Sequence, residues 1–168
     1  MQDMFVNLLN LPNPAGLYES LRGEGIEIHR ALAPDRKLVC DFVEKTFSAC
    51  AVGEAEAAFA RKPVSLFLAT EHDQLIGFAC YEATAPDFFG PTAVLESRRG
   101  RGIGRALLLR SLEAMRDELG YVYAIIGGVG PARFYEKCVG AQLIPGSDPG
   151  IYRHFLTPRQ NEESKKLF

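Results

Sequence analysis

The chain has 168 residues, of which 47% are hydrophobic, and its formal net charge at neutral pH is −2. A chain of this length can bury one compact core, so we expect a single domain over residues 1–168. The charge provides no chain-wide basic surface, and we expect no nucleic-acid partner. No apolar run reaches the roughly 18 residues that cross a bilayer, so we expect no membrane association.

The four cysteines, Cys40, Cys50, Cys80 and Cys138, have no metal-ligand spacing and lie in apolar surroundings. Free buried thiols in a reducing compartment are the simplest interpretation. We therefore expect a cytoplasmic protein without a metal site.

The expected elements alternate between strands and helices. In chain order we expect a strand over 25–32, helices over 35–47 and 53–61, a hairpin of strands over 63–70 and 74–84, a strand over 88–95, a helix over 105–119, a strand over 121–126, a helix over 131–138, and two late strands over 141–146 and 151–156. This order predicts an α+β fold with a central mixed, mostly antiparallel sheet flanked by helices on both faces. The core would span about 25–156, with an N-terminal extension over 1–24 and a C-terminal tail over 157–168.

The segment RRGRGIGR, residues 98–105, lies between an expected strand and an expected helix. The N-terminus of a helix carries roughly half a positive charge and free N–H groups, and glycines let the backbone approach an anion. These features favour a phosphate-bearing ligand, although a plain turn with solvated arginines is the alternative. The dinucleotide fingerprint is excluded because Arg105 stands where it needs glycine, and the P-loop ending GK[ST] is absent.

At these residues the chain resembles the GNAT superfamily of acyl-CoA-dependent N-acetyltransferases. The family pattern [Arg/Gln]-x-x-Gly-x-[Gly/Ala] is met by Arg99, Gly102 and Gly104, with Val94 at the usual strand valine five residues upstream. The resemblance covers about 25–156 and implies the GNAT fold. It also implies transfer of an acetyl group from acetyl-CoA to a primary amine of a small molecule or protein, by direct transfer in a ternary complex.

The resemblance further implies roles for individual residues. Coenzyme A would be bound by Val94, Leu95, Arg99, Gly100, Arg101, Gly102, Ile103, Gly104 and Arg105. The backbone N–H of Val94 would face the thioester oxygen. Tyr135 would act as the general acid that protonates the departing thiolate, unless it is a tyrosine that only packs.

The general base is left open between three carboxylates. Glu82 and Asp87 flank the entrance to the central strand, and Glu96 lies just past Val94, but each could equally be a solvated surface carboxylate. The partners would be coenzyme A and an amine acceptor, and family habit suggests a homodimer. A non-catalytic acyl-CoA-binding module that regulates a partner is the alternative function, although Tyr135 favours the enzyme.

Overall fold

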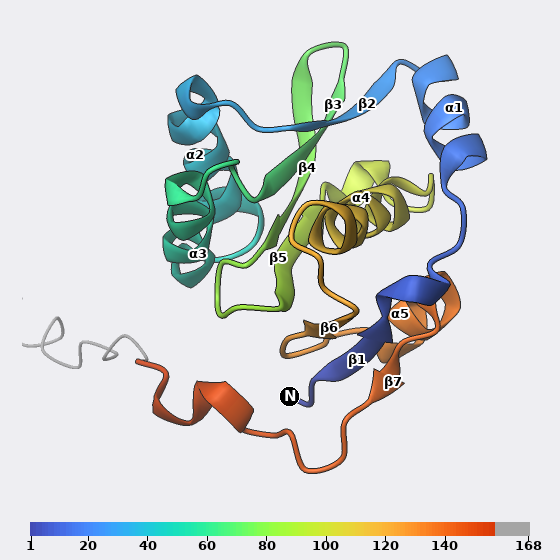
Figure 1. Cartoon of the computed structure of the whole chain (residues 1–168). Coiled ribbons are helices and arrows are strands. Elements are labelled where there is room, and N and C mark those ends of the chain that lie inside the picture. The colour runs from blue at the N-terminus through green and yellow to red at the C-terminus, as the bar shows by residue number, and fades with distance from the viewer. Residues whose placement is uncertain (157–168) are drawn as a thin grey trace, which may run out of the picture.

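The computed structural model describes residues 1–156, which form a central sheet with helices on both faces (Figure 1). The strands are β1 (Met4–Asn7), β2 (Ile26–Arg30), β3 (Leu66–Glu71), β4 (Gln74–Tyr81), β5 (Phe88–Val94), β6 (Tyr123–Ile126) and β7 (Gln142–Leu143). Across the sheet they follow the order β2-β3-β4-β5-β6-β1-β7. Every neighbouring pair is antiparallel except β5 and β6, which are parallel. The expected α+β fold with a mostly antiparallel sheet is confirmed.

Five helices of the described chain cover the sheet. They are α1 (Ala15–Gly23), α2 (Arg36–Thr46), α3 (Ala49–Ala60), α4 (Ile103–Asp117) and α5 (Ala132–Val139). The same part of the chain has four short 3₁₀ helices, η1 (Leu8–Asn10), η2 (Ala33–Asp35), η3 (Glu96–Arg98) and η4 (Gly150–His154). α2 and α3 pack on one face of the sheet, and α1 and α4 pack on the other (Figure 1).

The two faces of β3 show why both layers form. Leu66 and Leu68 belong to the core under α2 and α3, whereas Phe67 and Ala69 belong to the core under α4. Side chains of a strand alternate between the faces of its sheet, so an uninterrupted apolar strand is buried on both sides. β3 and β4 are therefore central strands.

α4 is the longest helix among the described residues and it places the glycine-rich segment. The helical spacing predicts a buried stripe of Leu108, Leu112, Met115 and Leu119; the first three are fully buried, whereas Leu119 lies beyond the end of the helix and is exposed. α4 begins at Ile103, two residues before the expected start, because Gly102 takes the left-handed conformation and ends the preceding turn. The N-terminus of α4 therefore lies directly after the turn that follows β5.

The two ends of the described chain differ from the expectation. Residues 4–7, which we placed in an extension before the core, form β1 and pair with both β6 and β7. Residues 151–156 do not form a strand, and that prediction is wrong. They belong largely to η4, whose Tyr152 N–H donates to Pro149 O at 3.0 Å, a local bond that replaces sheet pairing. The tail predicted over 157–168 lies outside the described residues.

The cysteine expectation also needs one correction. All four thiols are free, and Cys80 and Cys138 are buried, but Cys40 is only partly buried and Cys50 is exposed. Cys50 stands in the first turn of α3, beside the end of α2, where no element covers it.

Candidate active site

The parallel strands β5 and β6 separate soon after they meet. They pair only at Phe88–Ile125 and Phe89–Ile126, and β6 then ends while β5 continues to Val94. Leu95 donates its N–H to Ile76 O on β4 at 2.9 Å. Because successive residues of a strand direct their N–H groups to opposite sides, the N–H of Val94 faces the side that β6 has left open. An extended ligand can pair with this edge.

A groove of about 600 Å³ runs from this open edge to the N-terminus of α4. It is lined by Thr46, Phe47, Thr92, Ala93, Val94, Arg98, Arg99, Gly100, Gly102, Ile103, Gly104, Arg105, Pro131, Phe134 and Tyr135. The structure thus brings together most of the residues expected at the coenzyme. Leu95 and Arg101 do not line the groove.

The glycine-rich turn exposes backbone N–H groups to the groove. Gly100 and Gly102 have φ of +81° and +83°, a region that favours glycine. No side chain caps α4, and its first intrahelical bond runs from Ala106 N–H to Gly102 O at 2.9 Å. The N–H groups of Ile103, Gly104 and Arg105 therefore have no acceptor within the helix, which makes this end of the groove suited to an anion.

Two arginines add positive charge to the groove. Arg99 donates from Nε to Val94 O at 3.2 Å, and Arg105 lines the wall beside it. Neither forms an ion pair with a carboxylate in residues 1–156. Both guanidinium groups are thus available to a phosphate.

Arg101 has a different set of contacts from the expected one. Its guanidinium forms ion pairs with Glu71 at 2.7 Å and Glu24 at 2.8 Å, and Arg98 also pairs with Glu71 at 2.6 Å. Hydrogen bonds from Arg101 and then Arg98 lower the pKa of Glu71. The Arg101 side chain therefore fixes the turn to the end of β3 and to the residue after α1, and Arg101 does not contribute to the groove.

Tyr135 lies in α5 at the other wall of the groove, with 8% of its surface exposed. Its ring packs edge-on against Phe134, with centroids 5.0 Å apart, and against Phe89, with centroids 6.5 Å apart. Burial, followed by the nearby Cys138, raises the pKa of the phenol above its ordinary value. The hydroxyl is therefore a neutral proton donor at physiological pH.

The three candidate bases lie outside the groove lining. Glu82 is 4% exposed, forms an ion pair with Arg61 at 3.2 Å and accepts the Asp87 N–H at 2.5 Å. Burial and then the charge of Glu82 raise the pKa of Asp87. Glu96 is exposed in η3. The structure thus joins Glu82 and Asp87 to each other but not to Tyr135.

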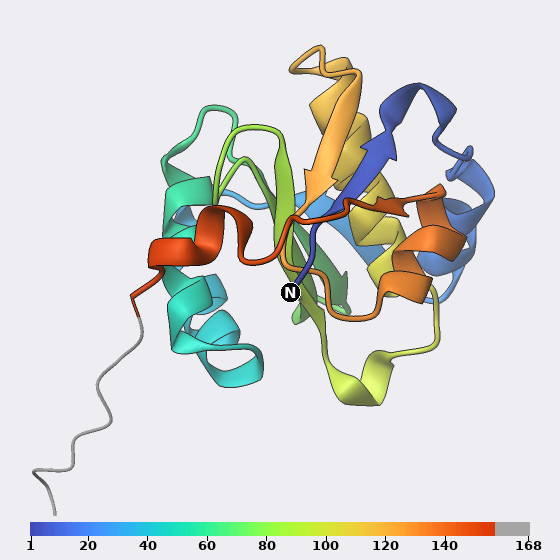
Figure 2. The same cartoon turned by 90° about the horizontal axis from the view of Figure 1, so that it is seen from below.

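A second cavity, of about 510 Å³, shares the Phe47 wall with the groove. It is lined by Met1, Phe47, Ser48, Cys50, Ala51, Glu54, Thr84, Phe89, Gly90, Pro91, Gly127, Gly128, Tyr152 and Phe155. Phe47 belongs to both spaces, and β5 runs through both, with 89–91 in the cavity and 92–94 in the groove. Figure 2 shows η4, in red, beside α3 at this cavity.

Sequence reasoning missed Glu54 and Tyr152 in this cavity. Glu54 lies in an alanine-rich helix among other surface carboxylates, and Tyr152 lies in a segment that we expected to be a strand. The alternation of small and charged residues in α3 contains no signal that separates Glu54 from Glu56.

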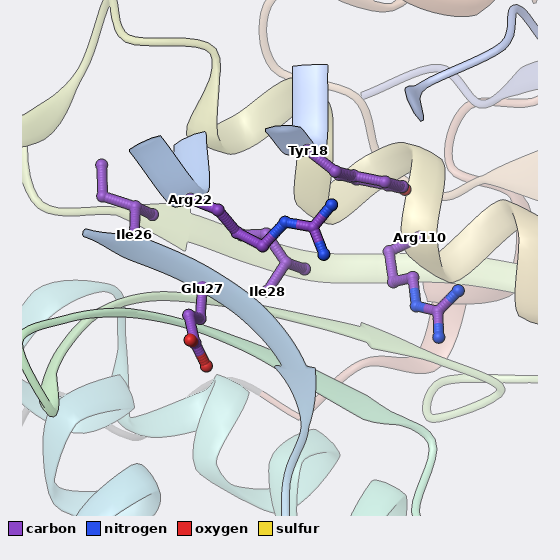
Figure 3. A pocket seen from close by; sticks show the side chains of 6 residues that line it. All are labelled: Tyr18, Arg22, Ile26, Glu27, Ile28 and Arg110. Carbon is purple, nitrogen blue, oxygen red and sulfur yellow. The ribbon is translucent and has the colours of Figure 1, made fainter. Parts of the chain in front are cut away.

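A third hollow, of about 350 Å³, lies between α1, β2 and α4 (Figure 3). Tyr18, Arg22 and Arg110 line it, and the Tyr18 hydroxyl donates to Glu113 at 3.0 Å. Burial raises the pKa of that tyrosine. None of its lining residues belongs to the groove or to the second cavity, so this hollow is separate from the split between β5 and β6.

Within residues 1–156, no cluster of three or more histidine, cysteine or carboxylate side chains has the arrangement of a metal site. Of the helices in that same part of the chain, none combines the length and the apolar character that a membrane span requires.

Known structures share this architecture. A GCN5-related glucosamine N-acetyltransferase region of a fungal multi-domain GH3 beta-N-acetylglucosaminidase superposes with a TM-score of 0.69 at 14% identity, over 85% of this chain and 19% of that chain. A GCN5-related N-acetyltransferase from Sphaerobacter thermophilus gives 0.59 at 22% identity, over 85% of this chain and 48% of that one. One from Kribbella flavida gives 0.58 at 17% identity, over 84% and 53%.

The chain thus spans about half the length of the two bacterial proteins and a fifth of the fungal one, and these likenesses show the fold. No curated protein sequence matches the chain significantly. Residues 62–138, which run from the start of the β3–β4 hairpin to α5, match the family model of the acetyltransferase (GNAT) domain. The resemblance at Arg99, Gly102 and Gly104 is therefore confirmed over this part of the chain, which is similar to the acetyltransferase (GNAT) domain.

Proposed function

We propose that the protein is an acetyl-CoA-dependent N-acetyltransferase that transfers the acetyl group directly to a primary amine in a ternary complex. The observation that carries this proposal is the pair of spaces along β5, a cationic groove and a cavity that both have Phe47 in their walls. Two substrates would occupy these two spaces and meet at the open edge of β5.

The groove fits coenzyme A in shape and charge. The free N–H groups at the start of α4, together with Arg99 and Arg105, would hold the pyrophosphate. A Cβ added to Gly104 would lie 3.7 Å from Phe134 Cζ and 3.8 Å from Val94 Cγ2, so a methyl group would fill the space between these walls of the groove. The unpaired edge at 92–94 would bind the pantetheine arm as an additional strand.

The coenzyme supplies an acetyl thioester. The protein would supply two hydrogen-bond donors, one for the carbonyl oxygen and one for the departing sulfur. The Val94 N–H would stabilise the negative charge on the carbonyl oxygen as the amine attacks. The C–S bond then breaks, and the Tyr135 hydroxyl would give its proton to the departing sulfur. Glu82, Asp87 and Glu96 have no direct access to the groove, so we propose that water passes the amine proton to one of them or to solvent.

The test is transfer from acetyl-CoA to a panel of primary amines, followed as thiol release and as the mass of the acetylated product. We expect thiol release that requires an amine and that falls sharply in Tyr135→Phe. Tight binding of acetyl-CoA in calorimetry, with no thiol release for any amine, would contradict the enzyme and support a binding module.

A further inference from the structure

We propose that the cavity beside the groove selects acceptors with two cationic groups, and that Glu54 binds the cation that does not react. This inference rests on the proposed function and names the substrate class of the same site. Its occupant would be a diamine, with one amine at the thioester and the second at Glu54.

The groove and the cavity carry opposite charges. The groove is lined by Arg98, Arg99 and Arg105 and by no carboxylate of the described residues. The cavity is lined by Glu54 and, within that same part of the chain, by no arginine, lysine or histidine side chain. The amino group of Met1 also reaches this region, but it pairs with Asp148 at 2.6 Å. The groove would therefore attract the anionic coenzyme, and the cavity would attract a cationic acceptor.

The Glu54 carboxylate can accept further hydrogen bonds from a ligand. Its Oε1 accepts the Thr84 hydroxyl, and no cation of residues 1–156 pairs with it. The cavity around it is mainly apolar, with Phe89, Pro91 and Phe155 among its walls. A carboxylate that accepts only one hydrogen bond from the protein can also bind a cation through a charge-assisted hydrogen bond.

Tyr152 closes the cavity without neutralising this charge. A Cβ at Gly127 would lie 2.5 Å from Tyr152 Oη, so glycine is required where η4 meets the end of β6. Burial, followed by the charges of Glu54 and Asp3, raises the pKa of Tyr152 to about 12. The phenol stays neutral, and the aromatic ring can line the path of a cation.

The cavity that Glu54 lines and the groove lie along different parts of β5, 89–91 and 92–94. Gly127 N–H donates to Phe89 O at 3.4 Å, which places the Tyr152 end of the cavity at the level of Phe89. Val94 lies five residues further along the strand, on the order of 15 Å away. The attacking nitrogen must lie within about 3.5 Å of the thioester carbon. Glu54 lines the cavity beside 89–91 and does not line the groove at 92–94, so we assign it to the second amine and not to the reacting one.

The experiment compares diamines with monoamines of the same chain length. We would measure kcat/KM for putrescine and cadaverine against n-butylamine and n-pentylamine, in the wild type and in Glu54→Gln. We expect each diamine to exceed its matched monoamine by at least about tenfold, the contribution of one charge-assisted hydrogen bond. Glu54→Gln should remove that preference and leave the monoamines within about threefold, since Gln can still accept the Thr84 hydroxyl.

Two variants serve as controls. Glu56→Gln makes the same change two residues away, at a carboxylate that pairs with Arg36 at 2.8 Å outside the cavity, and it should leave all four rates unchanged. Glu54→Asp keeps the charge but withdraws it by one methylene group. This variant should keep a preference for diamines and shift it from putrescine toward cadaverine.

Binding can be followed without turnover through Cys50, which is exposed and lines the cavity. We expect putrescine to slow alkylation of Cys50 by iodoacetamide in the wild type but not in Glu54→Gln. Equal kcat/KM for diamines and monoamines, or equal losses of both in Glu54→Gln, would overturn the inference and leave the proposed function standing. Protection of Cys50 that depends on Glu54, without acetyl transfer to any amine, would show that diamines bind at Glu54, but it would overturn the proposed function and with it the role of the diamine as acceptor.

Discussion

The rings of Phe89 and Tyr135 pack edge to face, with centroids 6.5 Å apart and planes at 72°. Phe89 lines the cavity that we assign to the acceptor, and Tyr135 lines the groove that we assign to coenzyme A. This contact therefore holds the proposed acid at the boundary between the two substrates. Aromatic pairs in this geometry are stabilising beyond their buried area, so the ring of Tyr135 has a defined position.

The first prediction concerns Tyr135→Phe. We expect kcat to fall about 10²- to 10⁴-fold, the usual range for the loss of a positioned acid, with acetyl-CoA affinity within a few-fold of the wild type. The ring and its contact with Phe89 are retained, so the melting temperature should stay close to that of the wild type. Steady-state kinetics and calorimetry separate the two effects.

The pH profile tests the same assignment independently. Burial raises the pKa of Tyr135 above the ordinary 10.0, so the hydroxyl stays protonated through the range in which the acceptor amine loses its proton. The wild-type rate should rise with pH and fall only above that raised pKa. An unchanged rate and an unchanged alkaline limb in Tyr135→Phe would reduce this tyrosine to a packing residue.

The second prediction contrasts two glycines of the turn. Gly104→Ala places a methyl group at ordinary contact distances within α4, and we expect it to stabilise the fold by roughly 0.5–1 kcal/mol while it weakens coenzyme A binding. Gly102→Ala has φ of +83° and a Cβ 2.9 Å from Leu17 Cδ1, so it should lose about 1–2 kcal/mol of stability as well as affinity. Thermal melts and calorimetry give both quantities. Unchanged affinity in Gly104→Ala would remove the phosphate site from this turn.

The third prediction concerns the arginines. Arg99→Ala and Arg105→Ala should each weaken coenzyme A binding by several-fold to about tenfold, and the loss should shrink as salt rises, because exposed charges are screened beyond ~8 Å at physiological ionic strength. Arg101→Ala should leave affinity nearly unchanged, since its guanidinium is occupied by Glu24 and Glu71. A larger binding loss in Arg101→Ala than in Arg99→Ala would contradict this division of roles.

The fourth prediction concerns Glu71 and acid stability. Its pKa is lower in the folded protein than in the unfolded chain because Arg101 and then Arg98 hydrogen-bond the carboxylate. This contribution to stability is complete above the ordinary pKa of 4.5 and is lost as pH falls through the lower folded value. Glu71→Gln should therefore lower the melting temperature at neutral pH, and the difference from the wild type should vanish at strongly acidic pH. A difference that persists there would assign the effect to packing.

The parts of the site that the sequence predicts well are those with local signals. Gly100 and Gly102 adopt positive φ, and the Leu108, Leu112 and Met115 stripe is buried, because each of these features depends on neighbouring residues in the chain. The position of Val94 follows from its fixed spacing before Arg99.

The parts that the sequence does not predict depend on distant partners. Nothing near Arg101 in the chain indicates that Glu24 and Glu71 will occupy its guanidinium. Glu54 becomes distinct from Glu56 only when Thr84 and η4 are brought beside it by the fold. Four residues such as Met4–Asn7 are too short a strand to recognise without β6 and β7 on either side.

The place of β1 in the sheet has a consequence for the order of folding. Met4 pairs with Ile126, about 120 positions later, and closing a loop of that length carries an entropic penalty on the order of 4 kcal/mol. The half of the sheet from β2 to β5 pairs sequential neighbours and can form while the chain is still being synthesised. β1 gains its partner only when β6 (Tyr123–Ile126) has been made, and β7 (Gln142–Leu143) pairs with β1 later still. The split between β5 and β6 is thus the boundary between a part of the sheet that can form early and a part that forms later.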